Sequence, residues 1–163
     1  MSKEKYYDME EQRRMEEKYA PIVMDLLERK FGEEPKDVRD EHKDFDFRCV
    51  GFTFGLKADS VIAETKNLFI ETLSVAQDTE LRKKGWLYSQ ECDYVIYLDT
   101  HNLRLLLLPL KPLQQYERFI KSFPRGWAQN KDRVSIRHLV PMRIIFLWLY
   151  GSFGIDWVEL EEN

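Results

Sequence analysis

The sequence predicts an α+β protein in which helices flank one central mixed β-sheet. Segments with helical spacing of apolar residues alternate with short apolar segments, in the order helix, strands, helix, strands, helix. The chain has 163 residues, of which 44% are apolar and 33% are charged. This size and composition suit a single globular domain, residues 1–163, with one substantial core.

The first half of the chain predicts one long helix followed by an antiparallel meander. Residues 7–31 place apolar side chains near helical spacing, with Pro21 expected to kink or divide the helix and Gly32 to cap it. Residues 33–43 are charged and contain a proline, which is typical of a loop. The expected strands, which we place side by side in one sheet, are residues 45–50, 52–57 and 68–73.

The second half predicts three more helices, which are separated by further strands. Residues 78–87 are polar and favour a short helix, whereas residues 94–98 and 103–108 predict a buried hairpin. Residues 112–123 are amphipathic and carry a proline in their first turn, which favours a helix. The remaining expected elements are a loop over residues 122–132, a strand over 134–140 and a helix over 141–150.

Several classes of protein do not fit the sequence. The charged first residues lack the apolar segment of a signal peptide, and the longest apolar stretch, residues 144–151, is far short of the ~20 residues that span a bilayer. Cys49 and Cys92 are not in metal-ligand spacing, which favours a reduced setting. We therefore expect a cytoplasmic protein with no membrane association.

Charge is unevenly distributed along the chain. The net charge is −4, yet residues 82–143 hold 12 Lys and Arg against 5 Asp and Glu. A basic half beside an acidic site would suit a DNA track, although helix surfaces that differ in sign explain the same pattern. The candidate DNA-binding residues are Arg82, Lys83, Lys84, Lys121 and Arg125.

An acidic residue on one strand and an acidic-x-Lys triplet on the next is a common way to hold a divalent cation beside a phosphodiester. Asp46 and Lys57 fit this arrangement, but the residue two before the lysine is Gly55. Mg²⁺ prefers carboxylate and carbonyl oxygens, and a neighbouring lysine stabilises charge on the phosphoryl group. Loss of the carboxylate at position 55 removes one ligand from such a site.

Five fragments in this order resemble the PD-(D/E)XK nuclease superfamily, which has the restriction-endonuclease-like fold, and in particular its small phage and bacterial members. The fragments are Asp46-Phe47, Gly55-Leu56-Lys57-Ala58-Asp59, Asn67-Leu68-Phe69-Ile70-Glu71, Gly85-Trp86 and Cys92-Asp93-Tyr94. The chain departs from the pattern at Gly55, where these proteins have Glu, and at Cys92, where they have Ala. The resemblance implies a helix-flanked mixed sheet, Mg²⁺ or Mn²⁺, and hydrolysis of phosphodiester bonds in DNA.

The resemblance also implies roles for single residues. Asp46 and Glu71 would be metal ligands, Lys57 the catalytic lysine and Asp59 a further acidic ligand. Glu71 replaces the missing carboxylate if residue 57 pairs with about residue 69, since glycine in a strand leaves room for the approach. In a second register, Glu64-Thr65-Lys66 would supply the acidic-x-Lys triplet instead.

Three functional hypotheses follow from these residues. The first is a metal-dependent DNA endonuclease, or an accessory nuclease of a phage or mobile element. The second is a nuclease-fold protein without catalysis that serves as a DNA-binding or protein-interaction module, and Gly55 is the feature that separates the two. The third is an α+β domain in which the motif is coincidental. A homodimer through the C-terminal tryptophans, Trp148 and Trp157, remains open.

Overall fold

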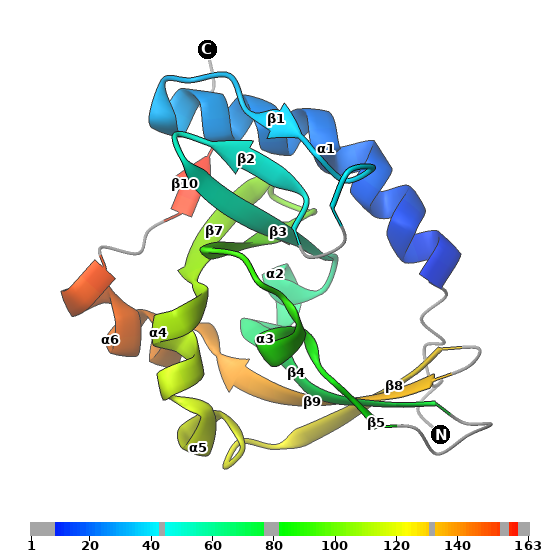
Figure 1. Cartoon of the computed structure of the whole chain (residues 1–163). Helices are drawn as coiled ribbons and strands as arrows, with labels where there is room; N and C mark the ends of the chain where they lie inside the picture. Colours follow the sequence, from blue (N-terminus) through cyan, green and yellow to red (C-terminus); the bar gives the residue numbers. More distant parts are fainter. Residues whose placement is uncertain (1–8, 43–44, 77–81, 131–132, 154–156, 160–163) are drawn as a thin grey trace.

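Two β-sheets organise the described part of the chain, which comprises residues 9–42, 45–76, 82–130, 133–153 and 157–159 of a computed structural model (Figure 1). The central sheet has the strand order β1-β2-β3-β6-β7-β10, and the second sheet has the order β5-β4-β9-β8. The strands of the central sheet are β1 (Lys36–Asp37), β2 (Phe47–Cys49), β3 (Phe52–Asp59), β6 (Tyr94–Asp99), β7 (Arg104–Pro109) and β10 (Trp157–Glu159). Those of the second sheet are β4 (Asn67–Ala76), β5 (Arg82–Lys84), β8 (Arg125–Asn130) and β9 (Arg133–Pro141). The helices are α1 (Met9–Phe31), α2 (Ile62–Thr65), α3 (Trp86–Ser89), α4 (Leu110–Gln115), α5 (Glu117–Ile120) and α6 (Met142–Phe153).

The central sheet is mixed, because β3 runs parallel to β6 whereas its other strand pairs are antiparallel. Helices flank it, so the predicted α+β class with a central mixed sheet is confirmed. The predicted hairpin is also confirmed: β6 and β7 pair along their full length and bury most of their side chains.

Helix α1 covers one face of the central sheet (Figure 1). It runs without interruption through Pro21, so of the two expected effects of this proline, a kink or a division, the division does not occur. Gly32 ends the helix as predicted, with a φ of +72° and an amide that donates to the carbonyl of Glu28 at 2.7 Å. The helix buries Val23, Leu26 and Leu27 against residues of β2, β3, β6 and β7.

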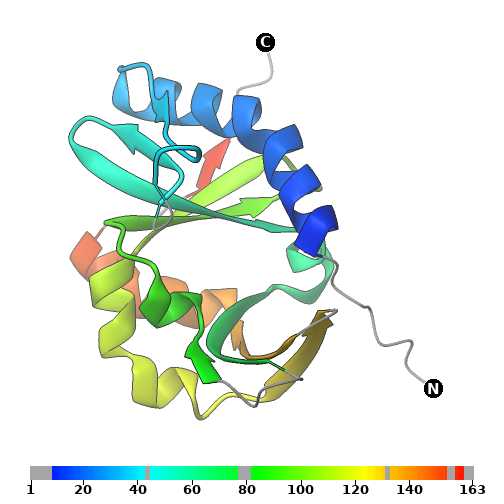
Figure 2. The ribbon, with the colours of Figure 1, turned by 45° about the vertical axis from the view of Figure 1, so that its right-hand side comes forward.

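The opposite face of the central sheet packs against the other helices, the first half of β4 and the end of β9 that pairs with it. Figure 2 shows the second sheet curving away beneath the central sheet, with α3 to α6 along one side. The buried residues of this second core come from both sheets and from α2 to α6: Ile62, Leu68, Ile70, Trp86, Leu87, Cys92, Val95, Tyr97, Leu106, Leu108, Leu110, Leu113, Ile120, Val140, Ile145 and Leu149. This core joins the two sheets.

One predicted neighbour relation is wrong. Strands β2 and β3 pair as expected, but β4, which contains residues 68–73, belongs to the second sheet. Both sides of β3 are already occupied, by β2 and by β6, so no ladder position is left for β4. The expected pairing of residue 57 with about 69 therefore does not occur, and the alternative triplet fails because residues 62–65 are helical.

Other element predictions are corrected in detail. In the region expected to be one helix, residues 82–84 form the edge strand β5 and residues 86–89 form α3, while residues 78–81 lie outside the described residues. The helix expected over residues 112–123 starts at residue 110 and divides at Tyr116 into α4 and α5. The loop expected over residues 122–132 contains β8, because pairing with β9 overrides its glycine and proline content. The strand and helix at residues 134–150 are confirmed as β9 and α6.

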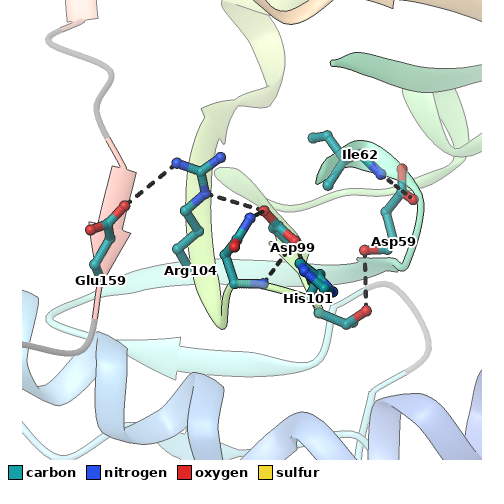
Figure 3. A network of polar contacts seen from close by, with 8 residues as sticks. Asp59, Ile62, Asp99, His101, Arg104 and Glu159 are labelled. Carbon is teal, nitrogen blue, oxygen red and sulfur yellow. Dashed lines mark hydrogen bonds and ion pairs between the residues drawn. The ribbon is translucent and has the colours of Figure 1, made fainter. Parts of the chain in front are cut away.

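A buried acid organises the turn between β6 and β7 (Figure 3). Asp99 accepts hydrogen bonds from the amides of His101 and Asn102, from the Asn102 side chain and from Arg104. Burial opposes its ionisation, but these hydrogen bonds outweigh burial and lower the pKa of Asp99. Arg104 also pairs with Glu159 at 3.5 Å, which ties the last strand to the sheet.

Candidate functional site

Asp46 lies against β3 at the level of the predicted triplet. Its amide donates to the carbonyl of Phe54 at 2.8 Å, and its Oδ2 accepts from the amide of Leu56 at 2.6 Å. These two bonds place the carboxyl group beside the Gly55-Leu56-Lys57 segment. The structure therefore brings together Asp46 and Lys57, as the sequence predicts.

Burial raises the pKa of Asp46. The hydrogen bond from the Leu56 amide and the charge of the Lys57 ammonium lower this pKa, but they offset the effect of burial only in part. The folded chain thus holds a carboxylate that would ionise more easily in water. Such imperfectly compensated groups concentrate at functional sites, because folding alone gives no reason to keep them.

Gly55 and Lys57 share one face of β3. In the parallel pairing they lie beside Val95 and Tyr97, which belong to the core between the two sheets, so this face turns toward the second sheet. A Cβ at position 55 would lie 2.5 Å from Oε1 of Gln90. The amide of Gln90 therefore occupies the space into which the motif glutamate would extend.

Cys92 completes this group of residues. Its thiol donates to Oε1 of Gln90 at 3.8 Å, and burial together with the nearby Asp46 carboxylate raises the pKa of Cys92 to about 11. We call Asp46, Gly55, Lys57, Gln90 and Cys92 the Asp46 cluster. Gln90 could not be predicted from the sequence, because no local pattern links a glutamine after α3 to a glycine on β3.

Asp59 serves the fold through both of its carboxylate oxygens. Oδ1 accepts from the amides of Val61 at 2.7 Å and Ile62 at 3.2 Å, and Oδ2 accepts from the Tyr97 hydroxyl at 2.5 Å (Figure 3 shows Asp59 and Ile62). The Tyr97 hydroxyl in turn accepts from the amide of Phe69 at 3.1 Å. Tyr97 thereby bridges β3 and β4, and Asp59 holds that bridge in place.

Replacing Tyr97 with phenylalanine should lower the free energy of unfolding by about 1–3 kcal/mol, because the Phe69 amide and the Asp59 carboxylate both lose a buried partner. Urea unfolding measures this change. Tyr94→Phe is the control, since phenylalanine keeps the stacking of the Tyr94 ring on Phe54, and it should change stability little. Equal effects of the two substitutions would contradict the role of the bridge.

The same bridge predicts a pH dependence. Burial, Asp59 and the hydrogen bond to it raise the pKa of Tyr97 well above 10. The bridge's contribution is therefore complete below pH 10, the ordinary value for tyrosine, and is lost as pH rises through the folded pKa.

Glu71 lies on β4, in the second sheet, directly opposite Arg137 of β9. Opposed residues of an antiparallel pair share a face, so Glu71 and Arg137 lie on the face of the second sheet opposite to Ile70 and Val140, which pack in the core shared with the central sheet. Across the described ranges, no three His, Cys, Asp or Glu side chains lie close enough together to hold a metal ion.

The predicted DNA-binding residues are exposed and lie at three separate places in the fold. Arg82, Lys83 and Lys84 make up β5, at one edge of the second sheet, while Arg125 begins β8 at the opposite edge. Lys121 is the C-cap residue that follows α5 and forms an ion pair with Glu117. The basic triplet is thus an edge strand rather than a helix end.

Comparisons with known proteins identify no family. No family model, no curated protein and no solved structure matches this chain. Among the described helices, none combines the length and apolar character needed to cross a membrane.

Proposed function

We propose that this protein is a nucleic-acid-binding module built on a nuclease-like site that has lost its cation centre. The observation that carries the proposal is the Gln90 amide, which fills the space beside Gly55 next to Asp46 and Lys57. Lys57, the lysine of a phosphate-binding site, is present, while the neutral Gln90 amide occupies the space of the second acid at position 55. Such a site attracts a phosphate without supplying the ligands for hydrolysis.

The charges of the second sheet support nucleic acid as the ligand. Among side chains that the structure describes there, five are Lys or Arg and one is acidic: Arg82, Lys83, Lys84, Arg125 and Arg137 against Glu71. The corresponding residues of the central sheet balance, with four bases and four acids. A local excess of positive charge on an acidic chain is the electrostatic pattern that favours phosphate backbones.

The residues present do not fit a preformed Mg²⁺ or Mn²⁺ site. Asp46 offers one carboxylate and Gln90 one amide oxygen, whereas both oxygens of Asp59 accept hydrogen bonds from Val61, Ile62 and Tyr97. Glu71 lies on the other sheet. Divalent cations of this kind favour several oxygen ligands around one point, and the described residues do not gather them.

A metal-dependent DNA endonuclease is the second candidate, and the raised pKa of Asp46 beside Lys57 favours it. Asp46 and Glu71 would then hold the cation. Lys57 would stabilise the phosphoryl charge, and Mg²⁺ or Mn²⁺ would supply the Lewis acid. An accessory nuclease of a phage or mobile element is the corresponding biological role.

Binding of labelled DNA in EDTA tests the first candidate. The natural chain should bind without metal, and Lys57→Met should weaken binding about 5- to 10-fold and reduce the salt slope by about one. Lys30→Met, at the exposed end of α1, is the charge-matched control and should bind like the natural chain. Asp46→Asn should retain binding and raise the thermal midpoint, because it removes an acid whose pKa burial raises.

The same proteins separate the two candidates when Mn²⁺ replaces EDTA. The binding module leaves single-stranded, duplex and branched DNA intact. Cleavage by the natural chain that Asp46→Asn and Lys57→Met abolish would instead establish the endonuclease. Absence of binding to every nucleic acid would overturn the first candidate.

A further inference from the structure

The part of the second sheet that contains the end of β4 and the start of β9 carries a cross-strand row of side chains on one face. Lys84 lies opposite Leu73, Leu73 opposite Ile136, and Ile136 opposite Trp127. Opposed residues in antiparallel strands share a face, so one row runs across all four strands. At about 4.8 Å between strands, the row spans about 14 Å.

A second row lies beside the first on the same face. Arg82 is opposite Val75, and Val75 is opposite Val134. An irregularity in β4 between Glu71 and Leu73 shifts its alternation by one residue, so that Leu73 stays on the same face as Ile70. We call the five apolar residues of the two rows the open face: Leu73, Val75, Trp127, Val134 and Ile136.

The open face is exposed because the helices stop short of it. At the other end of this face, where β4 begins and β9 ends, Ile70 and Val140 are fully buried by the core with α4 to α6. Beyond that point Leu73, Val75, Val134 and Ile136 are only partly buried, and Trp127 is 67% exposed. Trp127 and its four partly exposed apolar neighbours thus form a contiguous patch, and such patches mark interaction sites.

Among the residues that the structure describes, the charged side chains that border this face are basic. Lys84 and Arg82 border it at the β5 edge, and Arg125, two residues before Trp127 and therefore on the same face, borders it at β8. The acid of the sheet, Glu71, lies on the opposite face, together with Arg137. The face thus combines an apolar, aromatic centre with basic edges.

We propose that the open face binds single-stranded nucleic acid, with a base stacked on Trp127 and phosphates at Lys84, Arg82 and Arg125. This inference rests on the proposed function and names its ligand class. Base stacking on exposed aromatic side chains between basic groups is how sheets hold unpaired strands. A duplex keeps its base faces stacked inside, so it reaches the basic edges but not the centre.

Charge favours this occupant over a second protein. A protein partner would need an acidic rim to complement three basic side chains around the apolar rows. A second copy of this chain would instead bring the same basic edges together.

The test uses an oligothymidylate of about 15 nucleotides and a duplex of the same length. The single strand should bind more tightly and quench tryptophan fluorescence. Trp127→Ala should remove the quenching and weaken single-strand binding about 10-fold or more, with duplex binding changed little. Phe119→Ala is the control: Phe119 is 59% exposed on α5 and lies outside the open face, so binding should not change.

A second pair of variants tests the face assignment. Lys84→Glu reverses a charge that borders the open face. Lys83→Glu makes the same charge change on the opposite face of the sheet, where Lys83 pairs with Ser74. The single strand should lose more affinity with Lys84→Glu than with Lys83→Glu. Equal losses would overturn the assignment of the ligand to this face.

Failure of this inference is distinguishable from failure of the proposed site. Loss of binding with Lys57→Met but not with Trp127→Ala would overturn the open face and keep the Asp46 cluster as the nucleic-acid site. The reverse result would keep the open face and overturn the Asp46 cluster. A dimer that sedimentation detects without DNA, and that Trp127→Ala dissociates, would show a protein interface and overturn the inference.

Discussion

Replacing Gly85 with alanine should destabilise the protein by about 3 kcal/mol or more. A Cβ at position 85 would lie 2.3 Å from the carbonyl oxygen of Glu71 and 2.7 Å from the amide nitrogen of Thr72. Both obstacles are backbone atoms of β4, which cannot rotate away as a side chain can. The Gly85 amide also donates to the carbonyl of Thr72 at 3.1 Å, so the two segments are held together. Urea unfolding followed by circular dichroism measures the loss.

Gly51→Ala is the matched control for this substitution. Position 51 has no atom within 4 Å of an added Cβ, but its φ is +80°, so only backbone strain of about 1 kcal/mol is expected. A loss at position 85 no larger than that at position 51 would show that β4 moves aside easily. Because Gly85 contacts the irregularity that keeps Leu73 on the open face, Gly85→Ala should also weaken single-strand binding.

Combining Gly55→Glu with Gln90→Ala should create a Mn²⁺ site and Mn²⁺-dependent DNA cleavage in a chain that otherwise only binds. The atoms nearest to a Cβ at position 55 belong to the end of the Gln90 side chain, at 2.5–3.1 Å, so shortening that side chain makes the room. The new carboxylate would lie beside Asp46 and Lys57. A second carboxylate near a divalent cation should raise its affinity at least about tenfold.

Calorimetric titration with Mn²⁺ and a nuclease assay measure this gain. Cation binding should weaken in acid, because burial raises the pKa of Asp46 and a proton then competes for the carboxylate. Gln90→Ala alone should not gain affinity, and adding Asp46→Asn to the double variant should remove the gain. Cleavage by the natural chain that the double variant lowers would support the endonuclease, in which a further acid crowds a working site.

Elements that are defined by their own periodicity could be predicted from the sequence. The apolar spacing of the first helix gave its end at Phe31 and its cap at Gly32. The hairpin of β6 and β7 was predictable because two apolar segments flank a short polar turn. The last strand and helix, β9 and α6, were identified for the same reason.

The pairing partners of the strands could not be predicted from the local sequence pattern. Strand β4 has the pattern of a third meander strand, yet β6 occupies the side of β3 that it would have needed. Strand β8 contains Gly126 and follows Pro124, and this local sequence favours a loop. It forms a strand because it pairs with β9. A ladder depends on which strand is adjacent in space, and a single segment does not carry that information.

For the candidate site, the proximity of Asp46 and Lys57 could be predicted from the sequence, because the antiparallel pairing of two adjacent strands is a local property. The missing acid at position 55 is also visible in the sequence. The three-dimensional fold was needed to show that Gln90 fills the gap, that Asp59 binds Tyr97 and that Glu71 lies on another sheet. Each of these contacts joins segments that are far apart in the chain or separated by a turn, and the folding of two sheets around a shared core brings them together.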